Sequence, residues 1–143
     1  MSIETNIAAT RRLIEEGFSA GNPAAFDELV APDCVEHQRG QKPGIEGAKD
    51  TMRTLHTWFS DFELTIVDLI ASDDTVWIRN LARGVDTGGV LGRPPTGLPF
   101  EITVFDVLRF ADGRLIEHWG VPDQLGLLLQ LKLFGRPEVA AVA

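Results

Sequence analysis

The chain has 143 residues, the length of one ordinary domain, and 44% of them are hydrophobic while 24% are charged. This balance predicts a soluble globular protein with a hydrophobic core, not a disordered or a membrane protein. The formal net charge of −8 opposes contact with phosphate backbones, so a nucleic-acid partner is not expected. The N-terminus lacks the zones of a signal peptide and no stretch approaches the length of a membrane span, which predicts no membrane association and a cytoplasmic location.

The N-terminal half of the chain is predicted to be helical. Apolar residues recur at helical spacing through residues 3–18, and Gly21 follows as a stop signal. Residues 22–32 begin with Asn-Pro, a pair typical of a helix start, and should form a short second helix that ends at Pro32. A short extended segment is expected at residues 34–37, and a third helix at residues 45–60.

The period of the apolar residues changes to two in the C-terminal half, which indicates strands. Strands are predicted from Phe62 to a turn at Asp73-Asp74, and then over residues 75–85. A loop rich in Gly and Pro at residues 87–99 leads to a final hairpin at residues 100–122. Helices followed by antiparallel strands are typical of an α+β domain, with helices packed on one face of a curved antiparallel sheet.

The whole chain, residues 1–143, is predicted to form this single domain, because it contains no internal repeat and no low-complexity segment. Leucines crowd the segment that follows Pro122, so that segment should cover the mouth of the sheet or meet another subunit. Residues 136–143 are expected to be frayed.

Several kinds of chemistry are not expected from the sequence. Cys34 is the sole cysteine, which rules out an intramolecular disulfide framework, and its acidic neighbour Asp33 disfavours a nucleophilic thiol. The simplest interpretation of Cys34 is a small buried hydrophobe. The three histidines are scattered, and no phosphate-binding Gly-Lys-Ser/Thr follows the glycines of the loop. We therefore predict neither a metal nor a cofactor.

The most informative feature is a carboxylate in the final hairpin. Asp106 lies in the run 102–108, which is otherwise apolar on both faces of a strand, so the carboxylate is expected to be buried. A buried carboxylate needs a partner or a proton. The partner depends on the turn at residues 111–113, whose length sets the register of the two strands.

Two registers of the hairpin are possible. A two-residue turn would pair Asp106 with Trp119, whereas a three-residue turn, with its glycine in the left-handed region, pairs Asp106 with His118 and Arg109 with Glu117. The second register opposes unlike charges, which stabilises antiparallel strands, and we favour it.

The Asp106–His118 pair has two interpretations, an active site or a structural ion pair. Either Arg79 or Asn80 should point inward from the preceding strand, and an inward Arg79 would neutralise Asp106 and favour the structural interpretation. Two further polar residues, Glu36 and His37, are adjacent in a short strand, so only one of them can face the interior.

Two segments resemble a known family. Gly-Arg-Pro-Pro-Thr-Gly at residues 92–97 and Asp-Gly-Arg-Leu-Ile-Glu-His-Trp-Gly-Val-Pro-Asp-Gln-Leu-Gly at residues 112–126 resemble the SnoaL-like polyketide or ester cyclases, which belong to the nuclear transport factor 2-like superfamily. The likeness covers nearly the whole chain. It implies a cone-shaped pocket for a small apolar molecule, no cofactor, and a homodimer in which two sheets pack together.

The resemblance also bears on individual residues. The family's cyclases close a ring by an aldol step in which an aspartate is general acid and base, and this aspartate matches Gly120, which cannot transfer a proton. The family's pocket histidine matches Asp106, a pocket asparagine falls at or beside Glu36, and a histidine of the cyclases matches His118. These departures argue against the aldol step itself.

The resulting hypothesis is a cofactor-free acid–base enzyme of cyclase, isomerase, dehydratase or hydrolase type, acting on a polyketide-like or ester ligand. Asp106 is the proposed base and His118 its partner. The remaining predicted ligand contacts are Glu36 or His37 at the opposite wall, Trp77, Val104 and Leu108 as lining residues, and Gly120, opposite Val104, as the residue that leaves space. The alternative is a non-catalytic small-molecule-binding or dimer-scaffold protein of the same fold.

Overall fold

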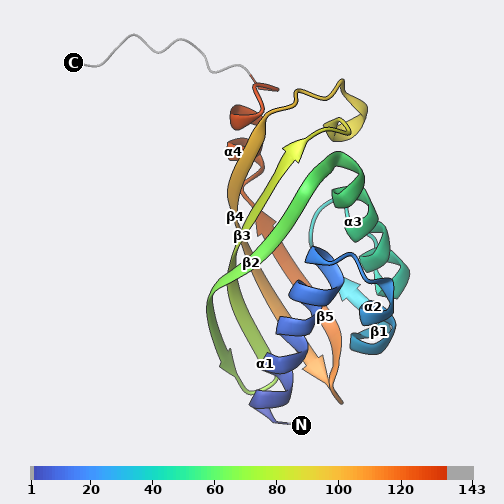
Figure 1. Cartoon of the computed structure of the whole chain (residues 1–143). Helices are drawn as coiled ribbons and strands as arrows, with labels where there is room; N and C mark the ends of the chain where they lie inside the picture. Colours follow the sequence, from blue (N-terminus) through green and yellow to red (C-terminus); the bar gives the residue numbers. More distant parts are fainter. Residues whose placement is uncertain (1, 135–143) are drawn as a thin grey trace, which may run out of the picture.

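The computed structural model describes residues 2–134 and consists of helices packed on one curved sheet (Figure 1). The expected fray at residues 136–143 lies outside the described residues. The helical elements are α1 (Ile3–Arg12), the π-helix η1 (Leu13–Ser19), α2 (Pro23–Leu29), α3 (Gly44–Trp58), the 3₁₀ turn η2 (Val90–Gly92) and α4 (Gln124–Gln130). The strands are β1 (Val30–Glu36), β2 (Phe59–Ser72), β3 (Thr75–Asp86), β4 (Pro99–Ala111) and β5 (Arg114–Pro122).

The N-terminal helices begin and end mostly as the sequence predicts. The side chain of Ser2 caps α1, the helix continues as η1 to Ser19, and Gly21 follows with a φ of 71°. The predicted end of the second helix at Pro32 is wrong, because α2 ends at Leu29 and the chain enters β1 directly. Proline is tolerated there because β1 is an edge strand, where a missing backbone N–H breaks no ladder.

The five strands form one sheet in the order β1-β5-β4-β3-β2. The sheet is curved and carries α1, α2 and α3 on its concave face, as predicted (Figure 1). It is not wholly antiparallel, because β1 runs parallel to β5 and pairs Glu36 with His118. This pairing brings a residue from the first third of the chain beside the last strand. None of the helices in residues 2–134 has the length and apolar character needed to cross a membrane.

The turn of the final hairpin contains two residues, not three. Asp112 and Gly113 both have positive φ, 51° and 75°, which is the geometry of a type I′ turn. Gly113 is thus in the left-handed region, as expected, but the strands pair Ala111 with Arg114 across a shorter loop.

A β-bulge in β5 then changes the register. Phe110 pairs with Leu115 and Arg109 pairs with Glu117, so Ile116 is an extra residue without a partner on β4. The predicted pairing of Arg109 with Glu117 is confirmed.

The predicted backbone pairing of Asp106 with His118 is wrong, because beyond the bulge Asp106 lies opposite Gly120 and Leu108 lies opposite His118. Side chains of residues two apart share a face, so Asp106 and His118 are diagonal neighbours on the concave side of the sheet. The strands therefore still bring the two side chains together.

Two apolar clusters hold the helices on the sheet. One lies beneath α1, η1 and α2 and includes Leu13, Phe26 and Val76, all buried. The other lies at the opposite end of the sheet and includes Phe100 and Leu131, which is fully buried. The leucine-rich segment that follows β5 thus packs on its own sheet, the first of the two outcomes expected for it.

Candidate active site

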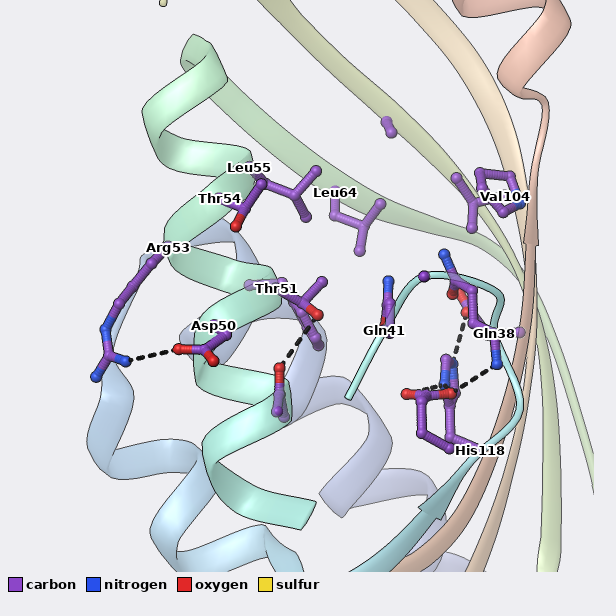
Figure 2. A pocket seen from close by; sticks show the side chains of 18 of the residues that line it. Gln38, Gln41, Asp50, Thr51, Arg53, Thr54, Leu55, Leu64, Val104 and His118 are labelled. Carbon is purple, nitrogen blue, oxygen red and sulfur yellow. Dashed lines mark hydrogen bonds and ion pairs between the residues drawn. The ribbon is translucent and has the colours of Figure 1, made fainter. Parts of the chain in front are cut away.

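A cavity of about 810 Å³ lies between α3 and the concave face of the sheet. Figure 2 shows its two walls, with Thr51 and Leu55 on α3 facing Val104 and His118 on the strands. Most of the lining is apolar, and Val104 and Leu108 belong to it as predicted. A largely apolar cavity of this size suits a small organic molecule.

The polar centre of the cavity is a carboxylate–imidazole–carboxylate group. His118 Nε2 lies 2.8 Å from Asp106 Oδ1, and His118 Nδ1 lies 2.7 Å from Glu36 Oε2. The three side chains are only 10–15% exposed, and all three line the cavity. One imidazole therefore connects two carboxylates that the sequence separates by 70 residues.

The protonation of His118 follows from these contacts. Burial by itself lowers the pKa of the imidazole, but the hydrogen bonds and negative charges of Asp106 and Glu36 outweigh it and raise the pKa to about 9. At neutral pH His118 is thus an imidazolium that donates from both nitrogens. The group then carries two negative charges and one positive charge.

The second oxygen of Asp106 has a partner of its own. Asn80 Nδ2 donates to Asp106 Oδ2 at 2.8 Å, and Asn80 is fully buried. Arg79 points to the outer face instead, where its guanidinium lies 2.6 Å from Asp68 Oδ2. The inward residue is therefore the neutral Asn80, so no guanidinium of β3 neutralises Asp106.

Two predicted ligand contacts lie outside the cavity. His37 is on the outer side, where it stacks on Trp119 with ring centroids 4.7 Å apart and bonds Glu117. Trp77 is 55% exposed on the outer face of the sheet. The prediction of Trp77 as a lining residue is wrong, since it alternates with the inward-facing residues of its strand.

The place of Gly120 also differs from the prediction. Gly120 lies opposite Asp106, whereas Val104 pairs with Pro122. Because of the bulge, Gly120 is on the concave face beside the carboxylate–imidazole group. The sequence predicts that only one of Glu36 and His37 faces the interior. In the structure that residue is Glu36.

A polar residue beside the carboxylate–imidazole group was not found from the sequence. Gln38 follows β1 in the polar loop before α3, lines the cavity, and donates its backbone N–H to Glu36 Oε2 at 3.1 Å. A glutamine in a polar loop gives no signal in sequence, because its position depends on the parallel pairing of β1. In the described part of the chain, no three His, Cys, Asp or Glu side chains are arranged to hold a metal ion.

Cys34 is expected to react only after unfolding. It is buried, and burial together with the charges of Glu36 and Asp33 raises the pKa of its thiol to about 11. Because the thiolate is the reactive form, a disulfide reagent such as Ellman's reagent should titrate no thiol in the native protein and one in urea. Rapid labelling of the native protein at pH 8, with Cys34→Ser as the blank, would contradict this.

Comparison with known proteins identifies the family of the chain. The family model for SnoaL-like polyketide cyclases matches residues 8–131. Aklanonic acid methyl ester cyclase DnrD from Streptomyces peucetius is 27% identical over 140 residues, covering 90% of this chain and 92% of that protein. Nogalonic acid methyl ester cyclase from Streptomyces nogalater is 24% identical over 119 residues, covering 80% and 88%.

Solved structures share the fold. IdmH from Streptomyces antibioticus is 34% identical with a TM-score of 0.79, and the match covers 89% of this chain and 98% of that one. TsrD from Streptomyces laurentii has a TM-score of 0.86 at 25% identity, with coverage of 94% and 99%.

Proposed function

The chain belongs to the family of SnoaL-like polyketide cyclases, and we propose that it is a cofactor-free acid–base enzyme that acts on a small, largely apolar polyketide-like or ester ligand. In this proposal Asp106 is the base and His118, held by Glu36, is its partner. The similarity to two methyl ester cyclases supports a ligand that carries a carbonyl group next to an acidic C–H bond.

One observation carries the proposal. His118 lies between two carboxylates in the wall of an apolar cavity of about 810 Å³. A structural ion pair needs only one carboxylate and no free space beside it, whereas a proton-transfer group needs access to a ligand. A buried carboxylate with fixed hydrogen bonds to Asn80 and His118 is held in one orientation toward that space.

The proposed step is a proton transfer from carbon. Asp106 takes the proton on the carbon next to the ligand's carbonyl, the C–H electron pair moves into the new C=C bond, and the carbonyl oxygen becomes an enolate. The positive charge of the His118 imidazolium stabilises the negative charge of that enolate. Return of the proton at another atom isomerises the ligand. Attack of the enolate carbon on a second carbonyl closes a ring, and the protonated Asp106 then supplies the proton for the new alkoxide.

A second candidate function is ligand binding without turnover. Gly120 supports it, because the family's catalytic aspartate matches a residue that has no side chain. The two candidates differ in whether protons on bound ligands exchange with solvent.

The test is exchange of α-protons in D₂O, followed by ¹H NMR on a panel of aryl β-keto methyl esters and naphthyl ketones. An enzyme should accelerate loss of the α-proton signal of at least one compound above the buffer rate, and Asp106→Asn should abolish the acceleration. Binding of the compounds with exchange at the buffer rate alone would support the ligand-binding candidate and overturn the proposed enzyme.

We also propose a homodimer through the outer face of the sheet. Trp77, Phe105, Trp119 and Val121 are exposed there on adjoining strands, and a patch of this kind is typical of an interface. Phe105→Glu should convert a dimer into a monomer in light scattering after size exclusion. Ile3→Glu, an exposed position on α1, is the matched control and should leave the dimer intact. A wild-type monomer at micromolar concentration would contradict the dimer.

A further inference from the structure

The space beside Gly120 is occupied by another side chain. A Cβ atom at Gly120 would overlap Gln38 Oε1, and it would lie 2.8 Å from Asp106 Oδ1 and 2.9 Å from His118 Cε1. The amide of Gln38 thus lies against the backbone of β5, next to the carboxylate and the imidazole. Figure 2 shows Gln38 beside His118 at the wall of the cavity.

The backbone of the loop fixes the position of Gln38. The N–H of His37 donates to the carbonyl of His118 at 2.9 Å, and the N–H of Gln38 donates to Glu36. The carbonyl of Gln38 accepts from the N–H of Gln41 at 3.2 Å. The start of the loop is therefore attached to β5 and to the carboxylate–imidazole group before any ligand binds.

The amide of Gln38 differs from the carboxylates and the imidazole beside it in having a free donor. Both nitrogens of His118 are engaged with carboxylates, and the NH₂ of Asn80 donates to Asp106. Among the described residues, the side chain of Gln38 makes no hydrogen bond. An amide NH₂ carries two donors, whereas the carboxylates of Asp106 and Glu36 carry none.

We propose that Gln38 takes the place of a side chain at position 120 and donates a hydrogen bond to the carbonyl oxygen of the ligand, with Gly120 providing the space for it. This proposal rests on the proposed function for the identity of the bound group, a carbonyl. It makes Gln38 a ligand-contacting residue and Gly120 the residue that determines where the Gln38 amide lies.

A substitution at Gly120 should therefore act through Gln38. In Gly120→Ala the new methyl group meets the far end of the Gln38 side chain, which is expected to move aside, and it also meets Asp106 Oδ1 and His118 Cε1, which must shift as well. Gln38→Ala and Gly120→Ala should then remove the same hydrogen bond, and the double variant should lose nothing more.

The probe is 2-acetylnaphthalene labelled with ¹³C at the carbonyl, and the readout is the C=O stretching frequency of the bound ketone in difference infrared spectra. A hydrogen bond lowers this frequency, so Gln38→Ala should raise it, Gly120→Ala should raise it to the same value, and the double variant should match both. The dissociation constant, measured by fluorescence, should increase roughly three- to tenfold in each, as expected for one net hydrogen bond.

Gln41 offers a matched control, because it is a glutamine of the same loop. Gln41→Ala should leave the carbonyl frequency of bound ketone unchanged, and its effect on affinity should add to that of Gly120→Ala. Equal frequencies in wild type and Gln38→Ala would overturn the proposal, and so would a frequency shift in Gly120→Ala that persists in full on the Gln38→Ala background.

Failure of this inference and failure of the proposed function are distinguishable. If the frequency shifts occur but no compound exchanges its α-proton, Gln38 is a ligand contact in a protein without turnover. If Asp106 supports exchange while Gln38→Ala changes neither frequency nor affinity, the enzyme stands and the role of Gln38 is rejected.

Discussion

Replacing Asp106 by Asn is expected to lower enzyme-catalysed α-proton exchange by a factor of about 10² to 10⁴, the usual contribution of a positioned general base. In the unsubstituted protein, Asn80 Nδ2 donates to Asp106 Oδ2. An asparagine at position 106 keeps the shape of the side chain, and its oxygen can still accept from Asn80 Nδ2. An amide cannot take up a proton at neutral pH. The variant thus removes the base, and its NH₂ group takes the place of the oxygen that accepts from His118 Nε2, so that hydrogen bond is lost as well.

Two comparisons make this result specific. Asp68→Asn is the matched control, since it makes the same change on an exposed carboxylate of the outer face and should leave exchange unchanged. Glu36→Gln keeps Asp106 but weakens the hold on His118, so its loss of exchange should be smaller than that of Asp106→Asn. If Asp106→Asn stays within twofold of wild type while it remains folded by circular dichroism, Asp106 is not the base.

The free energy of unfolding is expected to fall by about 3 kcal/mol between pH 6 and pH 10 through His118 alone. The pKa of this imidazole is raised from 6.5 to about 9 in the folded chain. A group whose pKa is higher when folded stabilises the fold fully below its unfolded pKa. The stabilisation is then lost progressively as the pH rises from 6.5 through about 9.

Urea unfolding at pH 6, 8 and 10 measures this effect, and it should be done in a Cys34→Ala background. The thiol of Cys34 also has a raised pKa, about 11, and would add its own loss of stability above pH 9. His118→Asn should flatten the pH dependence. A direct check is the ¹H NMR titration of the His118 ring, and a midpoint near 6.5 would contradict the expected value.

Periodicity was sufficient to predict much of the fold. The third helix, expected at residues 45–60, is α3 at Gly44–Trp58, and the final hairpin is β4 and β5. Both elements have long, regular apolar patterns, and such patterns report which face of an element is buried. The parallel pairing of β1 with β5 could not be predicted in this way, because it joins segments about 80 residues apart with no local signal.

The candidate site, too, was predicted only where local sequence patterns determine it. The burial of Asp106 followed from an apolar strand that contains one carboxylate. Its contact with His118 was predicted from direct pairing of the two residues, whereas the structure makes the contact diagonally, across the bulged register. The second carboxylate, Glu36, was placed at the opposite wall, yet it bonds the same imidazole because of the parallel pairing. Gln38 was missed altogether, since the position of a loop side chain depends on tertiary contacts that the chain's local pattern does not encode.

The single extra residue in β5 determines which residues of that strand face the cavity. Leu115 faces the interior, and strict alternation after it would turn Glu117 inward and His118 outward. Ile116 interrupts the alternation, so the cavity receives the imidazole and the outer face receives the carboxylate that Arg109 binds. In descendants of this chain, loss of the codon for Ile116 would place Glu117 directly after Leu115, so regular alternation would keep His118 and Gly120 on the inner face. The bulge can thus be lost in one step without moving the imidazole out of the cavity.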